Sequence, residues 1–69
     1  MRRPRNERQS LEEERAELPD QIAAYQRELD ATPTENRALR EMREWQIRRD
    51  KKRLAEIEAR LVAIRAETR

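Results

Sequence analysis

The sequence predicts an all-α protein, an elongated antiparallel helical hairpin or coiled coil that ends in one long helix. Charged residues make up 46% of its 69 residues, and Gly is absent. Abundant Glu, Arg, Ala and Leu at helical spacing is typical of coiled coils and long helices. Residues 34–69 contain neither Pro nor Gly, so nothing there interrupts a helix.

The composition excludes several classes of protein. Leu, Ile, Val and Phe together number only 11, too few for a sizeable globular core. The absence of Cys and His rules out disulfides and makes a zinc site unfavourable, and we expect no metal and no cofactor. No apolar run approaches the length of a membrane span, so we expect no membrane partner and a cytoplasmic location.

The first two segments differ in charge. Residues 1–9 are expected to be a flexible basic arm, either solvated or in contact with an acidic surface or phosphate. Residues 10–31 are expected to form an acidic first helix, with Ser10 as N-cap and Glu13 completing a capping box. Pro19 lies inside that helix and either kinks or breaks it.

The second helix is predicted over residues 32–69. Thr32 suits its N-cap, Pro33 its first position and Glu35 its capping box. The connection before it is very short, which predicts a hairpin whose tip lies near residue 31.

The charges support this fold. Residues 11–36 carry eight acidic and two basic side chains, whereas residues 37–53 carry eight basic and three acidic ones. A hairpin lays the first segment along the second, although an antiparallel dimer of straighter chains would pair the same charges.

The most regular apolar pattern lies near the C-terminus. Leu54, Ile57, Leu61 and Ile64 repeat at spacings of three and four, and we call them the C-terminal seam. When the residues of the two helices are paired outward from the tip, the second helix is the longer one. Leu61 and Ile64 then lie beyond the start of the first helix. We therefore expect the seam to project as a protein interface, unless the first ten residues fold back over it or the end of the helix frays. Farther from the C-terminus the stripe drifts, because Gln46 and Asp50 occupy seam positions.

Two further features are candidate binding residues. Trp45, the only Trp, lies off the seam. It is an interface anchor, it stacks on a nucleic-acid base, or it packs against the first helix or under Arg49. The densest basic cluster either pairs with the acidic arm or, with the basic arm, contacts nucleic-acid phosphate. The possible nucleic-acid contacts are Arg2, Arg3, Arg5, Arg48, Arg49, Lys51, Lys52 and Arg53.

Residues 47–54, Ile-Arg-Arg-Asp-Lys-Lys-Arg-Leu, faintly resemble the basic C-terminal helix of a small helical-hairpin protein family of the large ribosomal subunit. That resemblance implies contact with ribosomal RNA. It covers eight residues, and Lys51 stands where the family has an apolar residue. We assign no family from it.

No catalytic constellation is apparent. The sequence lacks His, Cys and any Gly-rich loop, and its carboxylates lie on helices expected to be exposed. We therefore expect a non-catalytic interaction or assembly module that docks through the C-terminal seam onto itself or a larger protein assembly, with no small-molecule substrate. The alternative is a hairpin that contacts RNA or DNA.

Overall fold

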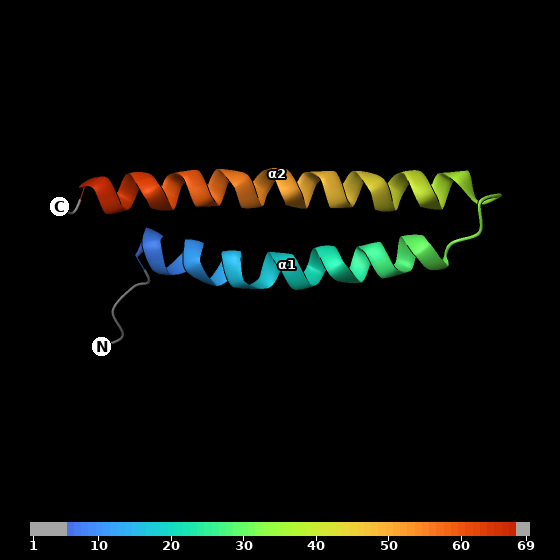
Figure 1. Cartoon of the computed structure of the whole chain (residues 1–69), viewed down its shortest axis with the longest axis horizontal. Helices are drawn as coiled ribbons and strands as arrows, with labels where there is room; N and C mark the ends of the chain where they lie inside the picture. Colours follow the sequence, from blue (N-terminus) through green and yellow to red (C-terminus); the bar gives the residue numbers. More distant parts are fainter. Residues whose placement is uncertain (1–5, 68–69) are drawn as a thin grey trace.

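A computed structural model describes residues 6–67, which form two helices packed side by side (Figure 1). Helix α1 spans Glu7–Ala31 and helix α2 spans Arg37–Glu67. They run antiparallel, so the start of α1 and the end of α2 lie at one end of the hairpin, near the chain termini in sequence, and the connection lies at the other. The 31 residues of α2 make that helix roughly 46 Å long at the usual rise. The predicted all-α hairpin is confirmed.

Helix α1 begins earlier than predicted. The side chain of Asn6 accepts a hydrogen bond of 2.8 Å from the backbone N–H of Gln9, which makes Asn6 the N-cap. Ser10 therefore lies inside the helix, and the predicted start at Ser10 is wrong. Asn and Ser are equally good caps; the earlier start also places the acidic Glu7 in the first turn, where the helix dipole favours it. The predicted basic arm over 1–9 is thus helical from Glu7, and residues 1–5 lie outside the described range.

The connection between the helices also differs from the prediction. Thr32 is the C-cap of α1, and its hydroxyl donates a 2.6 Å hydrogen bond to the carbonyl of Glu28. Asn36, not Thr32, caps α2, and its side chain accepts from the N–H of Leu39 at 3.4 Å. Asn is the stronger N-cap of the two, and the later start leaves residues 32–36 to reverse the chain direction.

One arginine of α2, Arg40, holds this connection in place through two hydrogen bonds, which we call the Arg40 clamp. Arg40 donates from Nη1 to the carbonyl of Leu29 at 3.1 Å and to that of Thr32 at 2.9 Å. The last turn of α1 has no basic residue of its own. Arg40 therefore supplies the positive charge that a helix C-terminus favours, from across the hairpin.

Pro19 does not break α1. The helix continues through it from Glu7 to Ala31, as the unbroken ribbon in Figure 1 shows. Pro19 has no N–H to offer the carbonyl of Arg15. The structure therefore favours the interpretation of a single helix that tolerates a proline, rather than two short helices.

The apolar core is concentrated in the half of the hairpin near the chain termini. Leu11 and Leu18 of α1 pack with Ile57 and Leu61 of α2, and Ile57 is fully buried. Leu54 and Ile64 are partly buried against this group. In the half near the connection, the buried apolar residues of the described chain are Leu29 and Ile47.

Candidate interaction surface

The C-terminal seam is part of the intramolecular core. Ile57 and Leu61 are buried, and Leu54 and Ile64 pack against the same cluster. The prediction that Leu61 and Ile64 project beyond the first helix is wrong, because α1 starts about one turn earlier than Ser10 and covers them. The seam therefore packs against α1 within the hairpin, and its role as a protein interface stays a prediction.

Trp45 remains on the surface. It is 54% exposed, although the guanidinium of Arg49 lies 4.9 Å from its ring centroid. Met42, one turn before it, is 44% exposed. The stacking on Arg49 agrees with one interpretation of Trp45, and the ring still presents a large apolar surface to the outside of α2. The role of Trp45 as an interface anchor stays a prediction.

The basic cluster divides into paired and unpaired side chains. Arg53 forms a two-pronged hydrogen-bonded ion pair with Glu14 of α1, and Arg49 contacts Asp50. Within residues 6–67, no ion pair or hydrogen bond engages the exposed side chains of Arg48, Lys51 and Lys52. We call these three residues the basic edge. Arg2, Arg3 and Arg5, the other predicted nucleic-acid contacts, lie outside the described residues.

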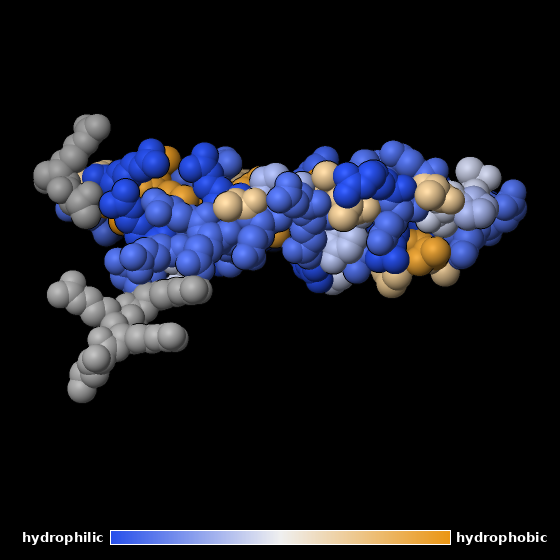
Figure 2. All heavy atoms as spheres, turned by 90° about the horizontal axis from the view of Figure 1, so that it is seen from below, coloured by the Kyte–Doolittle hydropathy of each residue, from blue (hydrophilic) through white to orange (hydrophobic). Residues whose placement is uncertain are grey.

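Helix α1 presents the opposite charge. Glu17 and Asp20 are exposed and have no ion-pair partner among the described residues. Asp20 is two residues from the buried Leu18, which places it about 200° around the helix and away from α2. We call Glu17 and Asp20 the acidic edge. Figure 2, viewed from the α1 side, shows mainly hydrophilic atoms over the half near the termini.

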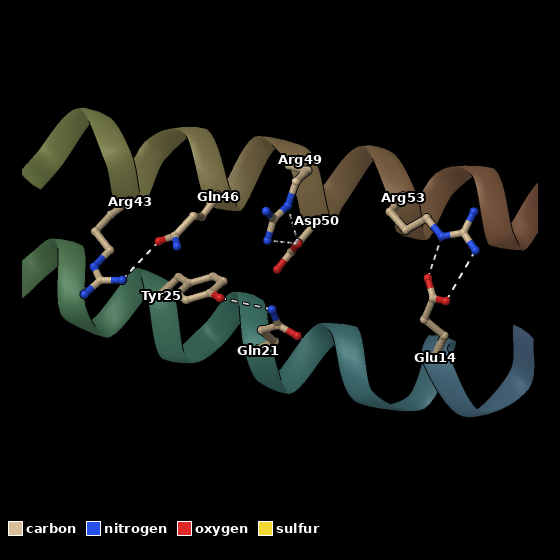
Figure 3. A network of polar contacts seen from close by, with 8 residues as sticks. All are labelled: Glu14, Gln21, Tyr25, Arg43, Gln46, Arg49, Asp50 and Arg53. Atoms are coloured by element: carbon tan, nitrogen blue, oxygen red, sulfur yellow. Dashed lines mark hydrogen bonds and ion pairs between the residues drawn. The ribbon is translucent and has the colours of Figure 1, made fainter. Parts of the chain in front are cut away.

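A polar layer separates the apolar core from the connection (Figure 3). Asp50 is only 4% exposed; its Oδ1 accepts from Arg49, and its Oδ2 has no hydrogen-bond partner among residues 6–67. Nearby, Arg43 lies with its guanidinium carbon 5.9 Å from the ring centroid of Tyr25. The Arg43 Nε is 3.0 Å from a carboxylate oxygen of Glu28, close enough for an ion pair but not aligned for a hydrogen bond.

Ion pairs fix the register of the two helices. Glu7 pairs with Arg60, Glu14 with Arg53 and Glu28 with Arg43. The hydrogen bond between Glu14 and Arg53 lowers the pKa of the Glu14 carboxyl and raises that of the guanidinium. These pairs confirm that the acidic arm lies along the basic one.

Sequence reasoning missed three features of this surface. It did not single out the clamp made by Arg40, the stacking of Arg43 on Tyr25, or the acidic edge. An arginine placed one helical turn after a hairpin connection is the only sequence signal that pointed to the clamp. The acidic edge could not be recognised among the many carboxylates of α1, because the sequence does not reveal which of them form ion pairs.

Nowhere in residues 6–67 do three His, Cys, Asp or Glu side chains converge as metal ligands would. Neither α1 nor α2 has an apolar stretch long enough to cross a membrane. Comparison with protein-family models, with curated proteins and with solved structures gives no match for this chain.

Proposed function

We propose that this chain is a non-catalytic helical interaction module that presents the outer side of α2, centred on Trp45, to a protein partner. The observation that supports the proposal is the exposure of Trp45 in a chain with one Trp, one Tyr and no Phe. The exposed Met42 extends the apolar surface along the helix. Aromatic residues and Met are enriched in protein interfaces, and Trp is prominent among the residues that dominate binding energy.

The hairpin suits this role because its core and its exposed anchor are separate. The C-terminal seam is used internally, so Trp45 and Met42 are not needed to close the apolar cluster. Arg49 covers one part of the Trp45 ring and limits its side-chain freedom. A partly ordered aromatic loses less entropy on binding than a free one.

The experiment replaces Met42 with a photo-crosslinking amino acid in the full chain, expressed in its own cells. Irradiation should yield a discrete covalent adduct with protein. The matched control places the same amino acid at Val62, which is 65% exposed but lies nearly three heptads away on the same helix. The Trp45→Ala substitution should remove the adduct at Met42. Equal adducts at Met42 and Val62, or an adduct that survives Trp45→Ala, would contradict the proposal.

A second candidate function is contact with nucleic-acid phosphate, favoured by the unpaired basic edge of Arg48, Lys51 and Lys52. Each phosphate neutralised by such a side chain releases counterions. Binding of the full chain to a duplex RNA should then weaken steeply as salt rises, and Arg48→Glu should reduce it. Weak, salt-independent RNA binding would eliminate this candidate.

A further inference from the structure

The two edges of the hairpin carry opposite charges at the same level along its axis. The Glu14–Arg53 and Glu28–Arg43 pairs place residues 14–28 of α1 beside residues 43–53 of α2. The acidic edge, Glu17 and Asp20, therefore lies level with the basic edge of Arg48, Lys51 and Lys52. One edge points away from the hairpin on the α1 side, and the other points away on the α2 side.

The charged residues on the outer sides of α1 and α2 also match in their spacing along the helices. Along α1, Asp20 is followed seven residues later by Arg27; along α2, Arg48 is preceded seven residues earlier by Glu41. Arg27 and Glu41 are exposed, and neither has an ion-pair partner in the described part of the chain. If the outer side of α1 lay antiparallel to the outer side of a second α2 at this level, Glu17 would lie opposite Lys52, Asp20 opposite Arg48, and Arg27 opposite Glu41. Each of these three pairs has opposite charges.

The apolar anchor falls within the same register. Trp45 lies between Glu41 and Arg48, so it would meet the stretch of α1 between Asp20 and Arg27. That stretch contains Ala23 and Ala24, whose small side chains leave room for an indole ring. The contact would thus have charged pairs on both sides of a buried aromatic, with no shift along the axis.

We propose that the partner is a second copy of this chain, docked side by side, with the outer side of its α1 against the outer side of α2. The inference rests on the proposed function, because it uses Trp45 as the anchor. Charge pairs at an interface set register and partner choice more than affinity, and the aromatic supplies the apolar contact. The contact is heterologous, so each added copy leaves a free edge and assembly continues into rows or closes into a ring.

The test measures the mass of the full chain in solution by sedimentation over a range of concentrations at low and high salt. The mass should rise with concentration beyond that of a dimer, and the rise should diminish as salt screens the charges. Asp20→Lys should keep the chain monomeric, and so should Arg48→Glu. Glu35→Lys is the matched control: it makes the same charge change in the exposed connection and should leave association intact.

Mixing the two edge variants gives the decisive result. The Asp20→Lys chain keeps its basic edge, and the Arg48→Glu chain keeps its acidic edge, so each can bind the other although neither binds itself. The mixture should therefore regain a mass above that of the monomer. Circular dichroism of each variant establishes that loss of association is not loss of helix.

Other outcomes overturn this inference. A wild-type chain that stays monomeric, a dimer unaffected by either substitution, or a mixture that remains monomeric would each do so. A monomer that still gives a Trp45-dependent adduct with a different protein would leave the proposed function standing. If neither self-association nor any Trp45-dependent adduct were detected, both this inference and the proposed function would be wrong.

Discussion

The half of the hairpin near the chain termini and the half near the connection are held together in different ways. In the first, Leu11, Leu18, Ile57 and Leu61 form a continuous apolar cluster. In the second, Leu29 and Ile47 are the buried apolar residues that the structure describes, and arginine contacts close the rest of the interface. Asp50 marks the boundary between the halves.

The contrast follows the spacing of apolar residues in α2. Where they recur at intervals of three and four, helix packing buries them on one face. Where Gln46 and Asp50 occupy those positions, the same face holds polar groups. The terminal half therefore provides most of the apolar stability. The exposed Trp45 and Met42 lie in the other half, so the proposed docking surface is largely separate from the core.

The largest predicted effect is the loss of packing in the terminal half. Ile57→Ala should reduce the free energy of unfolding by about 2–5 kcal/mol, because it leaves a cavity where the side chain is fully buried. Ile47→Ala should cost less, since a groove beside Ile47, Leu29 and Gln26 already leaves its surroundings incompletely packed. Urea denaturation followed by circular dichroism measures both.

Val62→Ala is the control for these substitutions. Val62 is 65% exposed on the same helix, so its truncation should change stability by no more than about 0.5 kcal/mol. If Ile47→Ala proved as costly as Ile57→Ala, the proposed difference between the halves would be wrong.

The next-largest predicted effect is a gain in stability on replacing Asp50, which lies at the boundary between the two halves. Asp50→Leu replaces a buried carboxylate whose Oδ2 has no hydrogen-bond partner among residues 6–67 and should raise the free energy of unfolding by about 1–4 kcal/mol. Its contact Arg49 is half exposed and can return to water. The gain is measured in urea, with Asp50→Asn as the control of similar size. A destabilised Asp50→Leu chain would mean that the carboxylate makes a needed contact.

The sequence was sufficient to predict the hairpin, the antiparallel pairing of acidic and basic arms, and the disturbance at Gln46 and Asp50. These features depend on periodicity and net charge over many residues, so an error at any single residue has little effect on them. It was not sufficient to locate the helix starts. Asn and Ser compete on equal terms as caps, and contacts between the helices, such as Glu7 with Arg60, add to the choice.

That small error moved the candidate site. A first helix starting after Ser10 would leave Leu61 and Ile64 uncovered, whereas a helix starting at Glu7 buries Leu61 and packs against Ile64. The exposure predicted for the end of the C-terminal seam was therefore wrong, because α1 begins about one turn earlier than predicted. Trp45 was identified correctly as lying off the seam, since its azimuth depends only on the helical period.

The two possible starts of α1 can be separated experimentally. Asn6→Ala should destabilise the terminal half by about 1 kcal/mol, because the N–H of Gln9 loses its acceptor. Ser10→Ala should be neutral or slightly stabilising, because Ala is the better residue inside a helix. Thermal unfolding of the two variants compares them directly. The reverse order would restore Ser10 as the cap and expose the end of the C-terminal seam.

The smallest predicted effect concerns the ion pair that flanks the apolar cluster. Because the hydrogen bond from Arg53 lowers the pKa of Glu14 in the folded chain, the unfolded chain takes up a proton at higher pH. The pair's contribution is therefore complete above the usual pKa of a glutamate and disappears as the pH falls through the lowered value. Glu14→Gln should lower the melting temperature slightly near neutral pH and have no effect in strong acid.

Glu35→Gln is the matched control for Glu14→Gln, since the exposed Glu35 has no ion-pair partner among the described residues and lies outside the acidic edge. Melting curves of both variants and the wild type, recorded from neutral to acid pH, should diverge only for Glu14→Gln and only at the neutral end. Added salt should reduce that difference, because both partners are partly exposed. A Glu14→Gln effect as large as that of Ile57→Ala would mean that the terminal half depends on charge as much as on packing.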